Sequence, residues 1–213
     1  MSKLITQFEE LLDVLTSADP KARRLVAIVG PPGSGKSTLS QALFDHFNQA
    51  MPGACAIAPM DGFHFDDDVL RARGRLDRKG APDTFDVGGL IALHQRLATN
   101  DEAEIAVPLF DRTLEISRAG ARIIDRSVQT VLMEGNYLLL NQSPWDQLAA
   151  FYDLTVQIDV DEAALKARLE ERWQVHGFSV EEGHRRVTEN DLPNARFVMA
   201  QSRPADIIYK GVG

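Results

Sequence analysis

The chain has 213 residues, 44% of them hydrophobic and 25% charged, which is typical of a globular domain with a core large enough to be stable alone. Its formal net charge of −8 argues against nucleic acid or an anionic membrane surface as the main partner. The single cysteine, Cys55, excludes an internal disulfide and favours a reducing compartment. No apolar stretch approaches the roughly 20 residues of a membrane span, and charges interrupt the N-terminal apolar pattern where a signal peptide would have none. We therefore expect a single domain over 1–213 in a cytoplasmic protein.

Hydrophobic patterns divide the chain into alternating helices and strands. Apolar residues recur at helical spacing over 3–17 and Pro20 ends the pattern, so an N-terminal helix is expected within 1–20. Helices are also expected after the first strand and over 89–98 and 161–173. Apolar, β-branched runs predict strands over 24–29, 55–60, 103–111, 128–135, 154–160 and 205–210. This alternation is typical of an α/β fold with a parallel sheet covered on both faces.

The segment GPPGSGKST (30–38) lies between the first strand and the next helix. Gly30, Gly35, Lys36 and Ser37 match the pattern G-x-x-x-x-G-K-S/T, which requires this strand, turn and helix context. Glycines let successive backbone N–H groups point inward, and the helix N-terminus adds positive partial charge. Lys36 would reach the β- and γ-phosphates of a nucleotide, and the Ser37 hydroxyl would bind magnesium. We expect the nucleotide to contact the whole loop, namely Gly30, Pro31, Pro32, Gly33, Ser34, Gly35, Lys36, Ser37 and Thr38.

Two acidic residues stand at the ends of predicted strands, Asp61 after 55–60 and Glu134 in the motif TVLMEG. Ligands of parallel sheets bind at the carboxyl ends of the strands, which is where the phosphate loop also lies. Phosphoryl transfer to a hydroxyl needs a carboxylate to orient and deprotonate the acceptor, and magnesium near the γ-phosphate. We expect Asp61 and Glu134 to share these tasks, although Asp61-Gly62 also suits a tight turn and Glu134 could cap a loop. Which of the two is the base stays open.

Two further segments carry polar signals. Residues 61–88 have no clean periodicity, and a loop of this length is usually functional, so we expect it to bind the acceptor. Within it, His64 could hydrogen-bond an acceptor hydroxyl or be a partly buried loop histidine. Residues 166–190 are expected to form a small helical lid, because Arg168 and Arg172 share one helix face and would repel each other unless an anion such as a triphosphate lies near them. A solvated charged helix is the alternative for this segment.

Over about residues 20–210, the ordered motifs GPPGSGKST, MDGFH, RKGAPDTFDV, PLFDR, MEGNYLLL and ADIIY resemble those of one kinase group. This is the phosphoribulokinase, uridine kinase and pantothenate kinase superfamily of P-loop kinases. The likeness is to its bacterial branch described as fructokinase or fructose-transport-system kinase in particular. The resemblance implies a P-loop NTPase three-layer sandwich, with a five-stranded parallel sheet of order 2-3-1-4-5 and a small helical lid. It also implies ATP and Mg²⁺ as cofactors.

The resemblance also assigns roles to residues. It makes Asp61 the catalytic base and puts Glu134 in the acid position after the Walker-B-like strand, where Glu134 and Ser37 would hold the metal. Segments specific to pantothenate or uridine recognition are not closely reproduced. With His64, the acceptor-binding residues implied by these motifs are Arg78, Lys79, Phe85, Asp86, Phe110, Asp111, Arg112, Asn136 and Tyr137.

The function that these observations favour is ATP-dependent phosphorylation of a small hydroxylated acceptor. A sugar such as fructose comes first, and a nucleoside or a pantothenate-like alcohol is the alternative within kinases. A regulatory or motor P-loop NTPase without a small acceptor is the alternative from another class. The chain has neither the N/T-K-x-D motif of guanine-binding switches nor an L-S-G-G-Q-type transport signature, which disfavours that alternative. The sequence leaves the oligomeric state open.

Overall fold

A parallel β-sheet runs through the centre of the protein in a computed structural model that describes residues 2–16 and 23–211. Its strand order is β1-β8-β7-β2-β6-β3, and every neighbouring pair is parallel. Without β1, and with the other five strands counted in chain order, this is the order 2-3-1-4-5 that the family resemblance implied. The strands are β1 (Lys3–Ile5), β2 (Arg24–Val29), β3 (Cys55–Pro59), β6 (Thr130–Gly135), β7 (Leu154–Ile158) and β8 (Ile207–Tyr209).

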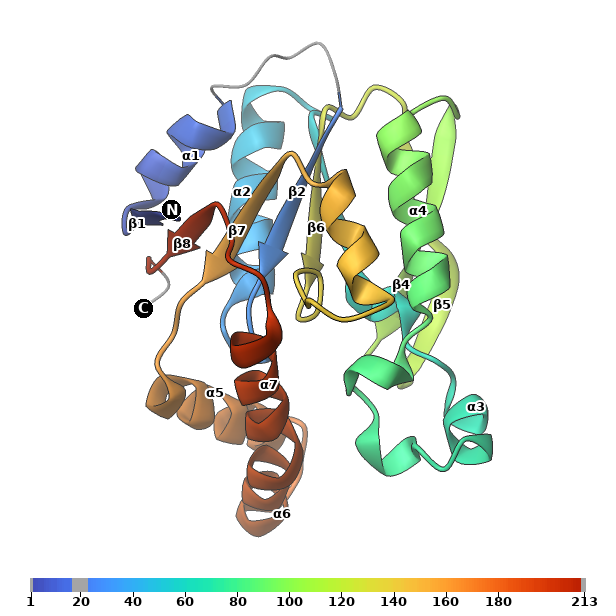
Figure 1. Cartoon of the computed structure of the whole chain (residues 1–213), viewed down its shortest axis with the longest axis vertical. Coiled ribbons are helices and arrows are strands. Elements are labelled where there is room, and N and C mark those ends of the chain that lie inside the picture. Colours follow the sequence, from blue (N-terminus) through green and yellow to red (C-terminus); the bar gives the residue numbers. More distant parts are fainter. Residues whose placement is uncertain (1, 17–22, 212–213) are drawn as a thin grey trace.

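The central strand β2 is buried on both faces because its apolar side chains alternate between two cores. Leu25, Ala27 and Val29 pack with α4 (Val87–Thr99) and the short helix η4 (Trp145–Phe151). Val26 and Ile28 pack with α1 (Phe8–Thr16) and α2 (Lys36–Ala50) on the opposite face. Figure 1 shows the resulting three layers, with α1 and α2 on one side of the sheet and α4 on the other. The α/β fold class predicted from the sequence is confirmed.

The predicted N-terminal helix is wrong at its start. Residues 3–5 form β1, which pairs with β8 from Lys3 opposite Ile207 to Ile5 opposite Tyr209, and the helix begins only at Phe8. Leu4 is 57% exposed while Ile5 is fully buried, which is the alternation of a strand. Leu4 and Ile5 fit the helical spacing equally well, and the free edge of β8 decides between the two. Residues 1 and 17–20, with the predicted stop at Pro20, lie outside the described residues.

A β-hairpin of β4 (Glu104–Asp111) and β5 (Ile116–Asp125) lies beside the edge strand β3. The strand predicted over 103–111 is confirmed, whereas β5 was not predicted. Arg122 on β5 donates a hydrogen bond to the backbone oxygen of Ile57 on β3. The hairpin thereby gives a partner to a carbonyl group at the open edge of the sheet.

Two arms extend from the carboxyl end of the sheet, at the lower side of Figure 1. The insert, residues 61–88, begins within the turn Met60–Phe63 and contains α3 (Asp67–Ala72) and short turns at Leu76–Arg78 and Pro82–Thr84. The helical arm, residues 162–201, contains α5 (Glu162–Val175), α6 (Val180–Arg186), a π-helical turn (Val187–Asp191) and α7 (Leu192–Gln201). Among the described residues, no helix is both long and apolar enough to cross a membrane.

The buried residue His94 on α4 generates a prediction about stability. Its Nδ1–H donates to the Leu90 oxygen at 2.8 Å, and its Nε2 accepts from the Tyr152 hydroxyl at 2.9 Å. Burial lowers the pKa of His94 to about 4 from an ordinary value of 6.5. Between these two values the unfolded chain binds a proton that the folded chain does not. The titration of His94 should therefore leave the free energy of unfolding unchanged above about pH 6.5. As the pH drops towards 4, it should lower this free energy by up to about 3 kcal/mol.

Urea denaturation of the wild type and of His94→Gln at pH 7.5 and pH 5 would measure this effect. Glutamine keeps hydrogen-bonding groups but does not titrate, so the variant should lose less stability than the wild type between the two pH values. Equal losses would show that His94 does not carry the pH dependence.

Candidate active site

The phosphate loop joins β2 to α2 and has a backbone that requires glycine at two positions. Gly33 has φ of 77° and Gly35 has φ of 95°, and both values lie in the left-handed region that strains other residues. Gly35 also caps the N-terminus of α2, a helix of 15 residues. A helix N-terminus that follows such a loop presents unpaired backbone N–H groups and positive partial charge. The loop therefore has the geometry of an anion-binding site.

Lys36 lies inside this loop, with only 8% of its surface exposed. Its Nζ donates a hydrogen bond to the backbone oxygen of Pro31 at 2.9 Å. Burial lowers the pKa of Lys36 to about 8, and the negative charges of Glu134 and Asp61 oppose this shift. The loop thus encloses a poorly hydrated cation near two carboxylates. A bound phosphate would stabilise the positive charge of this cation.

Ser37 and Glu134 form a pair of oxygen ligands next to the loop. The Ser37 hydroxyl donates to Glu134 Oε1 at 2.6 Å, and Glu134 sits near the end of β6, opposite Ile28 and Pro59. A hydroxyl and a carboxylate are suitable ligands for magnesium, which binds few protein groups and completes its shell with phosphate oxygens and water. The described residues contain no group of three or more His, Cys, Asp or Glu side chains that could hold a metal ion. Ser37 and Glu134 are the candidate oxygen ligands for a metal ion beside the loop.

Asp61 begins the insert at the end of the neighbouring strand β3. Its Oδ2 accepts a hydrogen bond from Arg112 Nη2 at 2.5 Å. Burial alone would raise the pKa of Asp61, but nearby His64, Arg112 and Lys36 hold it below the ordinary value. Asp61 is therefore ionised at neutral pH. The turn is packed tightly on β4, because a Cβ on Gly62 would lie 2.2 Å from the Pro108 oxygen.

His64 is clamped between two aromatic rings, with ring centroids 4.1 Å from Phe85 and 4.6 Å from Phe110. Its Nδ1 lies 2.8 Å from the Asp61 backbone oxygen, which can only accept, so Nδ1 carries the hydrogen. Burial lowers the pKa of His64 although Asp61 opposes this, so the ring is mostly neutral at pH 7. In that state Nε2 is the hydrogen-bond acceptor.

Two cavities meet at this edge of the sheet. A cavity of about 590 Å³ is lined by the phosphate loop and by Glu134, and also by Arg168 on α5. A second cavity of about 840 Å³ is lined by residues from the insert, the β4–β5 hairpin and the helical arm. The residues that line both cavities are Pro32, Asp61, Arg112, Asn136 and Arg172. The first cavity adjoins the anion-binding loop, and the carboxylate of Asp61 stands where the two cavities meet.

Most of the sequence-predicted residues come together here. Gly33, Gly35, Lys36, Ser37 and Thr38 line the first cavity, and Gly30, Pro31 and Ser34 form the frame of the loop without lining it. Arg168 Nη1 also donates to the Ser34 oxygen at 3.5 Å. The predicted acceptor residues that line the second cavity are His64, Arg78, Lys79, Phe85, Phe110, Arg112 and Asn136.

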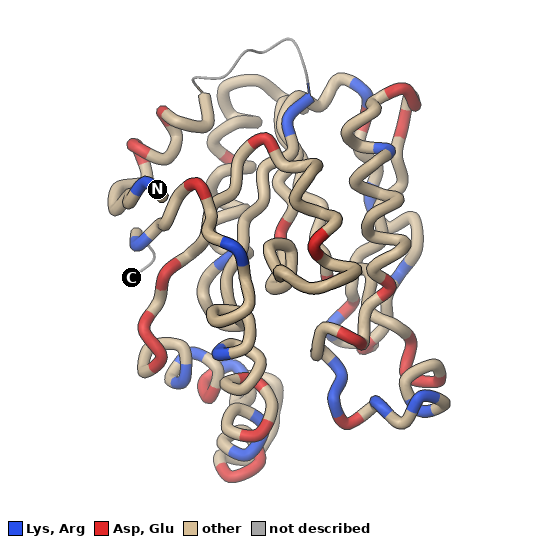
Figure 2. Tube along the Cα trace, in the orientation of Figure 1, with Lys and Arg blue, Asp and Glu red and all other residues tan. Residues whose placement is uncertain are grey.

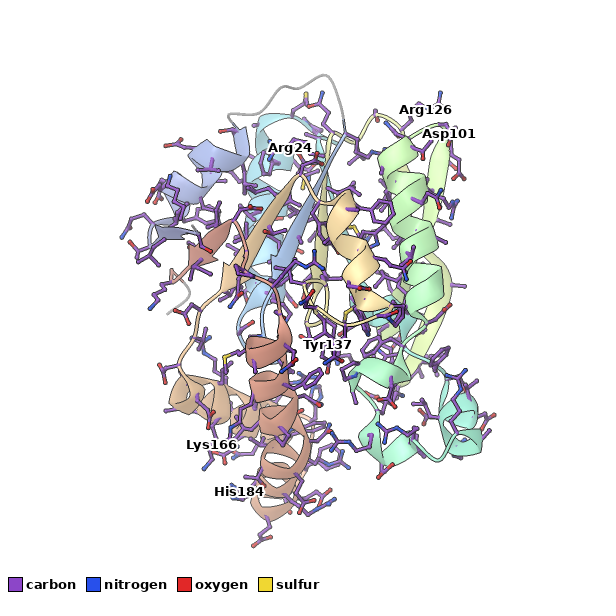
Figure 3. The ribbon with its side chains drawn as sticks, in the orientation of Figure 1. Arg24, Asp101, Arg126, Tyr137, Lys166 and His184 are labelled. Carbon is purple, nitrogen blue, oxygen red and sulfur yellow. The ribbon has the colours of Figure 1, made fainter. Side chains whose placement is uncertain are left out.

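Three predicted acceptor residues do not line either cavity. Asp86 is exposed and caps α4 by accepting from Gly89 N at 2.9 Å. Asp111 accepts from the N–H groups of Thr113 and Leu114, each at 3.1 Å, and so holds the hairpin turn. Tyr137 is buried between the sheet and the insert, where its hydroxyl donates to the Gly80 oxygen at 2.6 Å. Asp86 and Asp111 thus hold a helix start and a hairpin turn, and Tyr137 ties the segment after β6 to the insert at the place that Figure 3 labels.

The second cavity also has lining residues that sequence reasoning missed. Trp173 on α5, Asp191 in the π-helical turn and Asn194 on α7 come from the helical arm. Asp67 and Glu115 contribute from the insert and the hairpin turn. The run ENDLPN (189–194) contained a signal, since it places polar residues and a proline inside a helical pattern.

Comparison with known proteins identifies relatives over nearly the whole chain. No protein-family model matches it. The Escherichia coli K12 protein YggC is 33% identical over 202 residues, which is 94% of this chain and 83% of that protein. A "putative uridine kinase" of Schizosaccharomyces pombe is 31% identical, over 88% of this chain and 83% of its own length.

The chain is also similar to solved structures of proteins that are described as kinases. A "putative fructose transport system kinase" from Silicibacter shares 40% identity and a TM-score of 0.87, over 96% of this chain and 98% of that one. YFH7 from Saccharomyces cerevisiae, described as a "putative P-loop containing kinase", has a TM-score of 0.81 at 21% identity, over 98% of this chain and all of that one. The second structure supports the fold alone.

The buried lysine generates a prediction about nucleotide binding. Lys36→Met should weaken the binding of ATP about 10- to 100-fold, because it removes a charge-assisted hydrogen bond to phosphate. Wild-type binding should also weaken as the pH rises through about 8, where Lys36 loses its proton, and the variant should lack this dependence.

Titration calorimetry at several pH values would measure both effects. Lys3→Met is a matched control, because Lys3 is an exposed lysine of β1 that lines neither cavity. Unchanged affinity in Lys36→Met would contradict the assignment of the phosphate loop.

Proposed function

The chain belongs to the P-loop kinases of the phosphoribulokinase, uridine kinase and pantothenate kinase superfamily, and from that premise we propose how it uses ATP. It transfers the γ-phosphoryl group to a hydroxyl of a small, neutral, polyhydroxylated acceptor, most simply a sugar. The observation that carries this proposal is the position of Asp61 and Arg112, with Arg172, on the wall that the two cavities share. ATP would occupy the cavity at the phosphate loop, and the acceptor would occupy the other.

In this arrangement Asp61 is the base. It is ionised at neutral pH, and it lies where an acceptor hydroxyl would meet the γ-phosphate. Asp61 would orient the hydroxyl and take its proton as the oxygen attacks phosphorus, while ADP leaves with the electrons of the broken bond. Arg112 would position the carboxylate before the acceptor binds. Glu134 is held instead by the Ser37 hydroxyl on the nucleotide side, which suits a metal ligand better than a base.

The remaining charges on the shared wall would serve the phosphates. Lys36 would bind the β- and γ-phosphates, and Ser37 with Glu134 would hold Mg²⁺. When bound, the metal ion neutralises phosphate charge and favours the in-line arrangement. Arg168 and Arg172 lie on α5 and line the first cavity. They belong to residues 166–190, which would act as a lid over the nucleotide. Burial lowers the pKa of Arg172, so an anion arriving at this desolvated cation would be bound strongly.

The charges around the second cavity support a neutral acceptor. Several of the cations and carboxylates that line it pair with one another, as Lys79 does with Asp67 at 2.7 Å and Arg185 does with Glu189 at 2.9 Å. Figure 2 shows both signs interspersed along the insert and the helical arm. An acceptor carboxylate such as that of pantothenate would compete with these carboxylates for the cations. Phe85, Phe110 and Trp173 add apolar surface that fits the C–H faces of a sugar ring.

A coupled assay of ADP release tests this proposal, with D-fructose, other hexoses, uridine and pantothenate as acceptors. We expect a neutral sugar to give the highest kcat/KM. Preference for pantothenate would contradict the neutral acceptor, and preference for uridine would move the assignment to a nucleoside kinase. ADP release that no acceptor accelerates would contradict phosphoryl transfer to any of these compounds.

The role of Asp61 generates a prediction about the chemical step. Asp61→Asn keeps the shape of the side chain but removes its charge and basicity, so kcat should fall about 10²- to 10⁴-fold with little change in ATP affinity. Asp101→Asn is the matched control, because Asp101 is exposed and lies at the far end of the molecule from Tyr137 (Figure 3). Near-normal kcat in Asp61→Asn would move the role of base to Glu134.

The insert generates a prediction about acceptor binding. Lys79 lines the second cavity with its side chain 16% exposed, so Lys79→Met should raise the acceptor KM about tenfold and leave the KM for ATP unchanged. Asp86→Ala should leave both KM values unchanged but lower the free energy of unfolding by about 0.5–2 kcal/mol, because it removes an N-cap.

Steady-state kinetics and urea denaturation of both variants would measure these effects. A raised acceptor KM in Asp86→Ala would restore Asp86 to the acceptor site. A loss confined to ATP binding in Lys79→Met would place this part of the insert over the nucleotide instead.

A further inference from the structure

The helical arm brings one unusual carboxylate to the second cavity. Asp191 ends the π-helical turn of Val187–Asp191 and lines this cavity together with Arg172 and Asn194. We propose that Asp191 binds a hydroxyl group of the acceptor and helps to determine which acceptor is used. This inference rests on the proposed function, because it assigns a binding residue to the same acceptor site.

The hydrogen bonds of Asp191 leave one oxygen available. Its Oδ2 accepts from the indole Nε1–H of Trp173 at 2.7 Å, which fixes the orientation of the carboxylate. Its Oδ1 has no hydrogen-bond partner among the described residues, and no cation there lies within 4.0 Å of either oxygen. By contrast, Asp61 pairs with Arg112, and Asp67 pairs with Lys79. Asp191 is therefore a partly buried carboxylate that lines the cavity and has one oxygen without a partner within the described chain.

Partial burial limits the hydration of this carboxylate. Removing a carboxylate from water is unfavourable unless hydrogen bonds replace its hydration, and one indole N–H replaces only part of it. In agreement with this, burial raises the pKa of Asp191 although Trp173, Arg172 and Arg186 oppose the shift. A donor from the ligand would complete the shell of the carboxylate. A sugar hydroxyl supplies such a donor without adding the negative charge that Asp191 would repel.

The local backbone explains how Asp191 reaches the cavity. Leu192 N–H donates to the Val187 oxygen, which is the wider π spacing, and such single turns are frequent at functional sites. Pro193 has no N–H, so it cannot donate to the Glu189 oxygen as an α-helical residue would. That oxygen instead accepts from Arg78 Nη1 of the insert at 3.3 Å. The sequence around Asp191 thus widens the helix and ties it to the opposite wall of the same cavity.

A structural role for Asp191 makes a different prediction. If Asp191 only tied α5 to the π-helical turn through Trp173, removal of its charge would lower stability and leave acceptor recognition unchanged. Asp191→Asn separates the two roles, because asparagine can still accept from the indole and has nearly the same shape. Trp173→Phe removes the indole donor and part of the apolar ring surface in the cavity but leaves the carboxylate, so it should disturb the orientation of Asp191 and weaken acceptor binding less than Asp191→Asn does.

Titration calorimetry with D-fructose and each of its monodeoxy analogues, without ATP, tests the proposal. In the wild type, one analogue should bind about 10- to 100-fold more weakly than fructose, because it lacks the hydroxyl that donates to Asp191. In Asp191→Asn, fructose should bind about as weakly as that analogue, so the difference should disappear. Asp101→Asn is the matched control, since it makes the same change at an exposed carboxylate that lines neither cavity, and it should behave as the wild type does.

Three outcomes would separate this inference from the proposed function. Fructose binding and deoxy discrimination that stay unchanged in Asp191→Asn would overturn the role of Asp191, whatever the kinase assay shows. Binding that depends on Asp191, without any phosphorylation of fructose, would support the inference and contradict the proposed reaction on that sugar. If neither fructose nor any other hexose of the panel binds to the wild type, the hydroxyl-binding role is overturned together with the sugar acceptor.

Discussion

The parallel pairing of β2 with β6 and of β6 with β3 is the constraint on which the site depends. It places Glu134 opposite both Ile28 and Pro59, so the acidic end of β6 lies between the start of the phosphate loop and the start of the insert. The first turn of α2 then brings the Ser37 hydroxyl to Glu134 at 2.6 Å. A slip of one residue would turn Glu134 to the other face of the sheet and dismantle this edge. The two cores that bury alternate residues of β2 prevent such a slip.

The same edge gathers charges that would each be unfavourable alone. Lys36 is buried and the side chain of Asp61 is 28% exposed, and the charge of each opposes the other's cost of burial. Arg112 and Arg172 add further positive charge around Asp61, and burial lowers the pKa of Arg172. Taken together, the cations near the phosphate loop exceed what Asp61 and Glu134 neutralise. An incoming polyphosphate would therefore complete the electrostatics of the site, which is what a kinase of this family requires of its nucleotide cavity.

The second cavity is assembled by segments that are far apart in the chain. The insert follows β3, the hairpin precedes β6, and the helical arm follows β7, yet all three line the same space. The insert and the helical arm are joined by weak direct contacts, such as the hydrogen bond of 3.3 Å from Arg78 to the Glu189 oxygen. Such a contact forms and breaks easily, which suits a cavity that must admit an acceptor and release its product. A cavity of this kind beside the phosphate loop agrees with a small-molecule kinase and not with a nucleotide switch or motor.

What the sequence determined by itself depends on residues close together in the chain. The buried strand 24–29, the glycine loop and the helix that starts at Lys36 follow from local periodicity and from a motif of nine residues. The acidic residues at the ends of β3 and β6 follow from the same local reasoning, and the ordered motifs predicted the family and its strand order. Only the tertiary structure decided that 3–5 is an edge strand, because β8 offers it hydrogen bonds from about 200 residues away in the chain. It also decided that Asp86 caps α4 and Tyr137 hydrogen-bonds Gly80 while Asp191 lines the second cavity, since the direction of a side chain depends on elements that meet only after folding.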